Sequence, residues 1–329
     1  MIPMYSVDSA ISNFFASHTK ATQQECNKRA TALIGAQVMP TAIQGAFSYT
    51  VVGGSPARLV QFRTPDSDLD VDLLHLARSI HGGVIASSIQ HGYIGHSEPL
   101  SVYIIEKLPG ITYMESCIAN GANATLSPEE YQRQKNTIVD LSCFFAASWK
   151  NPQPMDTRSI QDTFAGKLQL LAQNLPSRFS ASVSQLRNNL PLLFSEGYPG
   201  VLTHGDLSEM NFLVNPETGH LTGVIDWAEA EILPFGCALW GLENVLGFMD
   251  MDGWHYFDSY KELEDLFWRT FNDTVSEDLG KKGRIISIAR KIGILFRYGF
   301  RWDKDSQQRI ITEEDSGMKY LDAFISQRV

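Results

Sequence analysis

The chain is organised around one stretch, residues 204–227, which reads HGDLSEMNFLVNPETGHLTGVIDW. Two short apolar runs, FLV and LTGVI, flank a cluster of turn-forming residues, NPETG. This pattern predicts an antiparallel hairpin, in which the residues that flank the two strands come back side by side. Asp206 and Asn211 precede the hairpin and Asp226 follows it, so the side-chain oxygens of Asn211 and Asp226 can converge. Carboxylate and amide oxygens suit Mg²⁺, which usually keeps room for phosphate oxygens.

The composition describes an ordinary globular protein, with 43% hydrophobic and 19% charged residues among 329. The net charge of −10 argues against a nucleic-acid partner, which needs a basic face, and permits a neutral or cationic substrate. We find no run that could span a membrane and no signal peptide, so we expect no membrane association. The four cysteines lack metal-type spacing, which favours reduced thiols in a cytoplasmic protein. No particular oligomeric state is indicated.

Residues 1–107 are expected to form a small lobe in which a helical extension precedes an antiparallel sheet and one helix. The expected elements are helical segments within 7–35, strands at Ile43, 47–52, 58–63 and 101–106, a GGSP turn at 53–56, and a helix over 67–80. Asp70 and Asp72 fall in the first turns of that helix, where acidic side chains stabilise the helix dipole. The turn GAFS, which ends at Ser48, is a weak phosphate-binding signal and equally an ordinary β-turn.

Residues 108–329 are expected to form a larger helical lobe that carries the hairpin. Ser127 begins the pattern Ser-Pro-Glu-Glu, which is typical of a helix N-terminus. The expected helices cover residues 127–150, 159–171, 180–190, 238–249, 260–274, 282–298 and 318–327. Together the two segments predict an α+β, bilobal architecture with a cleft between the lobes.

Transfer of a terminal phosphoryl group to a hydroxyl requires little covalent chemistry from a protein. It requires a carboxylate near the acceptor proton and a metal ion at the phosphates. The pattern HGDxxxxN, followed by IDW, resembles the aminoglycoside phosphotransferase and choline kinase-like family, which shares the protein-kinase fold. A looser similarity extends over residues 40–250 and includes GAFSYTV and VYIIEKLPG.

The resemblance implies an ATP- and Mg²⁺-dependent enzyme with Asp206 as the catalytic base and with Asn211 and Asp226 as metal ligands. It also implies that backbone atoms of residues Glu106 to Leu108 contact the adenine and that Ser48 lies near the nucleotide. Gly205 replaces an arginine typical of protein kinases, which points to a small-molecule acceptor. The acceptor class implied is a metabolite or an antibiotic with a hydroxyl group.

Two departures from the family pattern favour a second interpretation. The third strand reads LVQFR and has no lysine to hold the nucleotide phosphates; Gln61 and Arg63 share one face of that strand and are alternative replacements. Arg63 either pairs with Asp70 or Asp72 or lies in solvent. Cys237 stands where the family commonly carries an aspartate. The alternative is therefore a catalytically degenerate protein that binds a nucleotide or another ligand.

Further residues near the motif have open roles. His204 is expected to brace the loop rather than to move protons. Glu209 is either a substrate contact or exposed to solvent, and Glu229 is a candidate for substrate contact or, with Glu231, for bracing the loop. Residues 250–260, DMDGWHYFDSY, mix aromatic and acidic side chains and include Trp254. They predict either a wall for a cationic acceptor or an ordinary loop between helices with buried rings.

Overall fold

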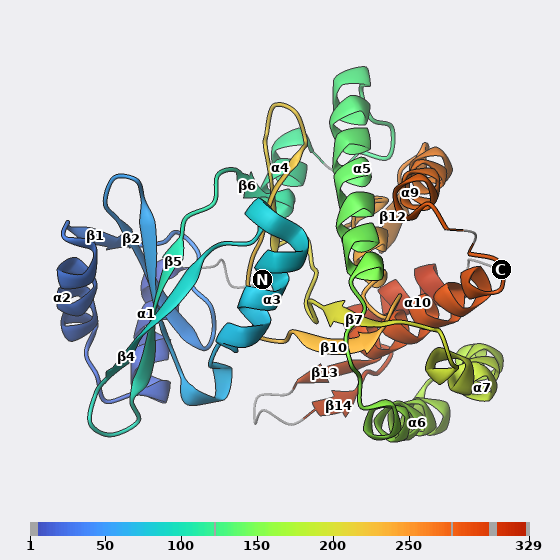
Figure 1. Ribbon diagram of the computed structural model, residues 1–329, viewed down its shortest axis with the longest axis horizontal. Helices are drawn as coiled ribbons and strands as arrows, with labels where there is room; N and C mark the ends of the chain where they lie inside the picture. Colours follow the sequence, from blue (N-terminus) through green and yellow to red (C-terminus); the bar gives the residue numbers. More distant parts are fainter. Residues whose placement is uncertain (1–5, 122, 278, 303–307, 327–329) are drawn as a thin grey trace. The chain divides into compact units, whose positions relative to one another are not determined.

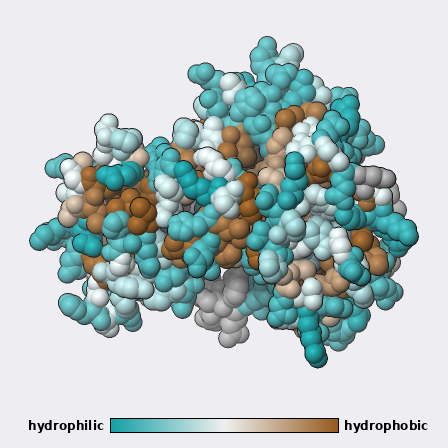
Figure 2. Space-filling model, viewed as in Figure 1, coloured by the Kyte–Doolittle hydropathy of each residue, from teal (hydrophilic) through white to brown (hydrophobic). Residues whose placement is uncertain are grey.

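The computed structural model describes residues 6–121, 123–277, 279–302 and 308–326. The chain divides into two compact units, Met1–Pro109 and Gly110–Val329. The first unit is rich in sheet and the second is mainly helical (Figure 1), so the predicted α+β class is confirmed. Hydrophilic residues cover much of the surface shown in Figure 2, and hydrophobic residues appear between them. None of the described helices is long and apolar enough to cross a membrane.

The N-terminal unit contains a five-stranded antiparallel sheet in the order β1-β2-β3-β5-β4. Its strands are β1 (Val38–Pro40), β2 (Ser48–Gly53), β3 (Arg58–Arg63), β4 (Ser88–Ile94) and β5 (Leu100–Glu106). The GGSP turn joins β2 and β3 as predicted. The expectation of a strand at Ile43 was wrong, because β1 pairs with β2 further upstream. Strand β4, which carries a bulge between Gln90 and Tyr93, was not expected.

Two helices, α1 (Val7–His18) and α2 (Gln23–Ile34), cover one face of this sheet. Their buried residues Phe14 and Ala30 pack with Tyr49 and Phe62 of the sheet in one apolar cluster. Because successive strand residues point to opposite faces, this packing leaves Gln61 and Arg63 on the other face.

Helix α3 (Val71–His81) begins later than expected because Asp70 is its N-cap. The Asp70 carboxylate accepts hydrogen bonds from the backbone N–H groups of Asp72 and Leu73, both at 3.0 Å. These bonds satisfy donors that the first turn of a helix leaves free. Ser67, expected as the first residue of the helix, instead ends a separate 3₁₀ turn, Pro65–Ser67.

The C-terminal unit is built around the long helix α5 (Figure 1). Ser127 caps it as predicted, because Ser127 Oγ accepts from the N–H of Glu130 and the Glu130 carboxylate accepts from the N–H of Ser127. The helices are α4 (Tyr113–Asn120), α5 (Pro128–Lys150), α6 (Thr157–Asn174), α7 (Ser180–Asn189), α8 (Trp240–Glu243), α9 (Tyr260–Val275), α10 (Lys282–Tyr298) and α11 (Ser316–Leu321).

The strands of this unit form small sheets of two or three strands. They are β6 (Ile111–Thr112), β7 (Gly200–Thr203), β8 (Phe212–Val214), β9 (Leu221–Val224), β10 (Glu231–Pro234), β11 (Gly247–Met249), β12 (Trp254–Tyr256), β13 (Phe300–Trp302) and β14 (Gln308–Ile310). Between α5, β10 and α9 lies an aromatic core. Its members include Phe145, Trp149, Phe235 and Phe271, and the rings of Trp149 and Phe235 lie 4.9 Å apart.

The expected helix over residues 238–249 was wrong. Only the short helix α8 forms, and the segment ends in β11, which pairs with β12. Residues 238–247 are all buried. The hydrophobic pattern of this run therefore shows neither the periodicity of a helix nor that of a strand, and it could not distinguish the two. The same pairing corrects the loop expected at residues 250–260, because Trp254 lies on β12. The expected helix over 318–327 is helical over its described residues: α11 ends at Leu321 and continues as a π-helical turn, Asp322–Ser326, and residue 327 lies outside the described residues.

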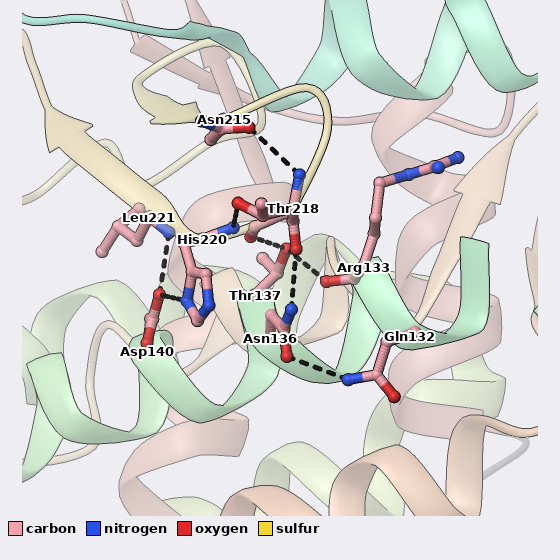
Figure 3. Close-up of polar contacts among 10 residues, drawn as sticks. Gln132, Arg133, Asn136, Thr137, Asp140, Asn215, Thr218, His220 and Leu221 are labelled. Atoms are coloured by element: carbon pink, nitrogen blue, oxygen red, sulfur yellow. Dashed lines mark hydrogen bonds and ion pairs between the residues drawn. The ribbon is translucent and has the colours of Figure 1, made fainter. Parts of the chain in front are cut away.

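The turn of the β8–β9 hairpin is fastened to α5 (Figure 3). Asn136 and Thr137 donate hydrogen bonds to the backbone oxygens of Thr218 and Gly219, at 2.8 and 2.6 Å. Asp140 accepts a bond of 2.9 Å from the N–H of Leu221. Gly219 has a φ of +75°, and a Cβ there would lie 2.3 Å from the backbone oxygen of Arg133. Only glycine allows this contact between the turn and the helix.

We expect Gly219→Ala to destabilise the protein by at least about 2 kcal/mol more than Gly197→Ala. Gly197 has a similar φ of +78°, but a Cβ at this position would have no atom within 4 Å, so its substitution adds only backbone strain of about 1–2 kcal/mol. Urea unfolding of both variants measures the difference. Equal free energies of unfolding would show that the turn does not depend on its contact with α5.

Candidate functional site

Two loops carry the residues singled out by the sequence, and paired strands hold both loops side by side. The first loop, residues 204–211, leads from β7 to β8; the second loop, residues 225–230, leads from β9 to β10. Strand β7 pairs with β10, with Thr203 opposite Glu231, and β8 pairs with β9, with Phe212 opposite Val224. Each loop therefore begins and ends beside the other.

The two loops also contact each other directly. The N–H of Ile225 donates to the backbone oxygen of Asn211 at 2.8 Å. Gly205, with φ of +81°, passes so close to the second loop that a Cβ would lie 2.1 Å from the backbone oxygen of Glu229. Glycine at position 205 is therefore required for the close approach of the two loops. This structural role is separate from the earlier expectation that the missing arginine points to a small-molecule acceptor.

His204 braces the two loops. The N–H of Asp206 donates to Nδ1 of His204 at 3.2 Å, so Nδ1 is the unprotonated nitrogen. Nε2–H then donates to the backbone oxygen of Ile225 at 2.8 Å. The ring packs edge-on against Trp227, with centroids 4.6 Å apart. Burial lowers the pKa of His204, which favours the neutral ring that this pair of bonds requires.

The two carboxylate oxygens of Asp206 have different partners. Oδ2 accepts a hydrogen bond of 2.8 Å from Nδ2 of Asn211, which also donates to the backbone oxygen of Asp206 at 2.8 Å. Oδ1 lies 2.7 Å from a guanidinium nitrogen of Arg297. No described residue directs a hydrogen bond at Oδ1, so the contact with Arg297 is an ion pair without hydrogen-bond alignment. The carboxylate is thus held on one side and charge-paired on the other.

Arg297 was not singled out by the sequence. It lies in the last turn of α10, and its guanidinium stacks over the ring of Trp240 at 4.7 Å from the centroid. Helical periodicity predicts which residues of a helix face the core, but it does not predict which distant loop a polar residue meets. Nothing in the spacing between residues 206 and 297 marks the pair.

The residues proposed as metal ligands, Asn211 and Asp226, lie where the two strands of the hairpin begin and end. Asn211 is buried and uses its amide nitrogen for Asp206, and its Oδ1 accepts no hydrogen bond from a described residue. Asp226 follows β9, is exposed, and has a φ of +60°. Such a backbone is uncommon for a residue other than glycine and is enriched at functional sites. An amide oxygen and a carboxylate fit Mg²⁺, which is typically bound by few protein ligands together with phosphates.

Three acidic residues in or next to the loops have pKa values raised above the ordinary value of a glutamate. Burial raises the pKa of Glu209 in the first loop, the nearby Asp206 carboxylate adds to this, and Arg297 opposes it. Glu229 reaches solvent in part, yet the desolvation that remains, together with Asp206, raises its pKa. At the start of β10, burial also raises the pKa of Glu231, and Lys167 opposes this.

Cys237, which stands in place of the family aspartate, lies after β10 and is buried. Burial raises the pKa of its thiol far above the ordinary value, so the side chain is a neutral thiol. The loops are instead held together by His204, by Asn211 and by the close approach of Gly205 to Glu229. The side chains of Glu229 and Glu231 are not needed for those contacts.

In the N-terminal unit, Gln61 and Arg63 are joined to each other. Arg63 is buried, so the alternative in which it lies in solvent was wrong. Its guanidinium donates to Gln61 Oε1 at 2.8 Å, to the backbone oxygen of Ser67 at 2.5 Å and to Ser67 Oγ at 2.7 Å. Gln61 in turn donates to Thr50 Oγ1 at 3.1 Å. The two alternatives for the missing lysine therefore form one hydrogen-bonded group.

The other predicted residues of this unit have structural contacts. Ser48 is buried at the start of β2, opposite Arg63. Asp70 caps α3, and Asp72 is exposed in the first turn. The Glu106 carboxylate accepts from the N–H of Ser87 at 3.1 Å, and this bond lowers the pKa of Glu106. Leu108 is buried. These contacts concern side chains, whereas the expected adenine contact at 106–108 involves the backbone.

Comparison with known proteins identifies the family of the chain and finds solved structures with a similar fold. The model of the phosphotransferase enzyme family matches residues 73–250, more than half of the chain. None of the curated proteins matches the chain. Among solved structures, an amicoumacin kinase bound to AMP-PNP and Ca²⁺ is 15% identical with a TM-score of 0.56, and the match covers 85% of each chain.

Two further solved structures agree with this assignment of the fold. A choline/ethanolamine kinase family protein from Mesorhizobium loti is 13% identical with a TM-score of 0.51, covering 84% of this chain and 83% of the other. The GDP complex of an aminoglycoside phosphotransferase is 16% identical with a TM-score of 0.50, covering 84% and 90%. At these identities the likeness shows the kinase-like fold, as the sequence predicted.

We expect Glu209→Gln to be more stable than the wild type at neutral pH. A carboxyl group whose pKa is raised by folding costs stability as the pH rises from its unfolded value, about 4.3, through its folded value. The variant cannot ionise, so its advantage should vanish in acid and grow toward neutral pH. Urea unfolding across the pH range measures this, with Glu217→Gln on the exposed hairpin turn as the matched control. An advantage that grows as the pH falls would contradict the assignment.

Proposed function

We propose that this chain, which belongs to the phosphotransferase enzyme family, transfers the γ-phosphoryl group of ATP to a hydroxyl of a small molecule in a Mg²⁺-dependent reaction. One observation carries the proposal: paired strands bring Asp206, Asn211 and Asp226 onto two adjacent loops. These residues supply a carboxylate for the acceptor and two oxygen ligands for a metal.

Asp206 is proposed to orient the acceptor hydroxyl and to receive its proton. The hydroxyl oxygen forms a bond to the γ-phosphorus, the bond from that phosphorus to the β–γ bridging oxygen breaks, and ADP leaves with the electron pair. The proton passes to Asp206 and then to solvent. Asn211 holds Oδ2 of Asp206, and Arg297 fixes the other side of the carboxylate. Reorganisation during the reaction is therefore small.

Magnesium, when bound, would neutralise charge that accumulates on the phosphate oxygens. Asn211 would contribute Oδ1, because its amide nitrogen is already used by Asp206, and Asp226 would contribute its exposed carboxylate. The loop contacts through Ile225 keep these two ligands on facing segments. In the N-terminal unit, we propose that the bonded pair Gln61 and Arg63 takes the place of the missing lysine in binding phosphate.

We expect Asp206→Asn to lower the rate of phosphoryl transfer by about 10³-fold, because the amide keeps the shape of the side chain but does not accept the proton. Labelled ATP, Mg²⁺ and a library of hydroxyl-bearing small molecules, read out by mass spectrometry of the products, provide the assay. Transfer at the wild-type rate in Asp206→Asn would refute the role of this residue.

Two further variants, a control and one with an intermediate effect, are measured in the same assay. Glu217→Gln alters an exposed residue of the hairpin turn and should keep the wild-type rate. Arg297→Met removes the charge beside Asp206 while leaving Asp206 itself in place, so its rate should fall between those of the wild type and Asp206→Asn. An Arg297→Met rate below that of Asp206→Asn would place Arg297 in the chemistry itself.

We expect Asn211→Ala and Asp226→Asn to raise the Mg²⁺ concentration needed for half-maximal activity by at least about tenfold, since each removes or weakens a ligand. Asn174→Ala on the exposed side of α6 makes the same change as Asn211→Ala away from the loops and should leave the Mg²⁺ requirement unchanged. A Mg²⁺ titration of activity measures the shift. An unchanged midpoint in both loop variants would remove them from the metal site.

A second candidate function is nucleotide binding without transfer. It is favoured by the absence of a lysine on β3 and by the ion pair that Asp206 already makes with Arg297. Titration calorimetry with ATP and Mg²⁺ separates the two candidates. Nucleotide binding in the absence of transfer to any compound of the library would support this one.

A further inference from the structure

A cavity of about 450 Å³ lies within the C-terminal unit and reaches the first loop through Glu209. Helix α4, the start of α5, the β11–β12 hairpin and α11 surround it. Its volume lies within the range of sites for small molecules. The backbone oxygen of Glu209 accepts a hydrogen bond of 2.9 Å from the N–H of Met114. This bond ties the loop that carries Asp206 to the helix that lines the cavity.

The cavity is lined mainly by aromatic and aliphatic side chains. Its rings are those of Tyr113, Phe248, Trp254, Phe257 and Tyr320. Trp254 contributes the polar feature: Nε1 is buried and has no hydrogen-bond partner among the described residues. A buried donor without a partner costs free energy, which a ligand with an acceptor oxygen at this place would recover.

The charges around the cavity do not suit a polycation. Among the described residues that line it, the charged ones are Glu130, Arg133 and Glu209. The Glu130 carboxylate is used in the cap of α5, which leaves the Glu209 carboxylate as the other one among these lining residues. Each ammonium group taken from water into this cavity would need a carboxylate to compensate its desolvation. The lining does not supply them.

The acidic residues of the 250–260 segment are engaged elsewhere. Asp250 lies 2.9 Å from His255 and accepts from two backbone N–H groups. Asp258 accepts from Thr125 Oγ1 at 2.5 Å. Neither they nor Asp252 are among the described residues that line the cavity, although Trp254 and Phe257 are. Aromatic side chains of this segment therefore line the cavity, whereas its acidic side chains do not.

We infer that this cavity is the acceptor site and that it takes an uncharged, largely apolar alcohol with an acceptor oxygen beside Trp254. The inference rests on the proposed function, in which the hydroxyl of this alcohol attacks the γ-phosphorus of ATP, ADP leaves, and Asp206 receives the proton. The alcohol would enter with its hydroxyl toward the first loop, where Glu209 joins the cavity to Asp206.

Two panels of probes test the substrate class: uncharged cyclic alcohols small enough for about 450 Å³, and polycationic aminosugars such as kanamycin. Transfer from labelled ATP and direct binding by calorimetry are measured for both. We expect binding and phosphorylation of members of the first panel, with kcat/KM at least about tenfold above that of any aminosugar. Preferential phosphorylation of aminosugars would overturn the inference while leaving the phosphotransferase function intact.

Trp254→Phe tests the polar contact because it keeps a ring and removes the N–H. The KM for the best alcohol should rise by about fivefold to tenfold and the KM for ATP should stay unchanged. Trp268→Phe on α9 makes the same change outside this cavity and should alter neither value. An equal effect of both variants, or none, would overturn the assignment of Trp254.

Binding without transfer separates the two proposals. If uncharged alcohols bind, Trp254→Phe weakens them, and no phosphate is transferred, the cavity is a ligand site of the predicted class and the phosphotransferase function fails. Cys117→Phe, which places a ring into the cavity from α4, should abolish that binding without changing the affinity for ATP. If neither panel binds, the inference fails.

Discussion

Backbone pairing between two short pairs of strands is the constraint on which the rest of the site depends. Strands β7 and β10 fix one end of both loops, and β8 and β9 fix the other end. Once the backbone is paired, the buried ring of His204 and the absence of a side chain at Gly205 hold the loops at contact distance. The positions of Asp206, Asn211 and Asp226 follow from the pairing.

The pairing in turn relies on α5. Side chains of Asn136, Thr137 and Asp140 satisfy backbone groups of the hairpin turn, and Gly219 lets the turn approach the helix. The other end of α5 enters the aromatic core through Trp149. A single helix thus connects the hydrophobic core, which supplies most of the stability, with a turn of polar residues that could not fold alone. Rigid support of this kind is what a site of three polar side chains requires.

Local signals account for what the sequence predicted well. Ser127 with its capping box, the GGSP turn and the NPETG turn each specify a backbone geometry within a few residues, and all three form as expected. The motif HGDxxxxN and IDW likewise identified the hairpin and the family. The errors have a shared cause. Residues 238–249 lie in a segment that is almost entirely buried, so their pattern carries no period, and β4 is half exposed with a bulge that breaks its alternation.

The site was less predictable than the fold for a different physical reason. Which groups a side chain meets depends on tertiary packing across long separations in the sequence, as for Arg297 with Asp206. Tertiary packing also decides which charged groups a ligand meets. The segment DMDGWHYFDSY joins acids and rings in sequence, and its composition favours a cationic ligand. The hairpin of β11 and β12 turns Trp254 into the cavity lining while Asp250 binds His255. Composition gives the charge of a segment, but only the fold decides which of its faces a ligand meets.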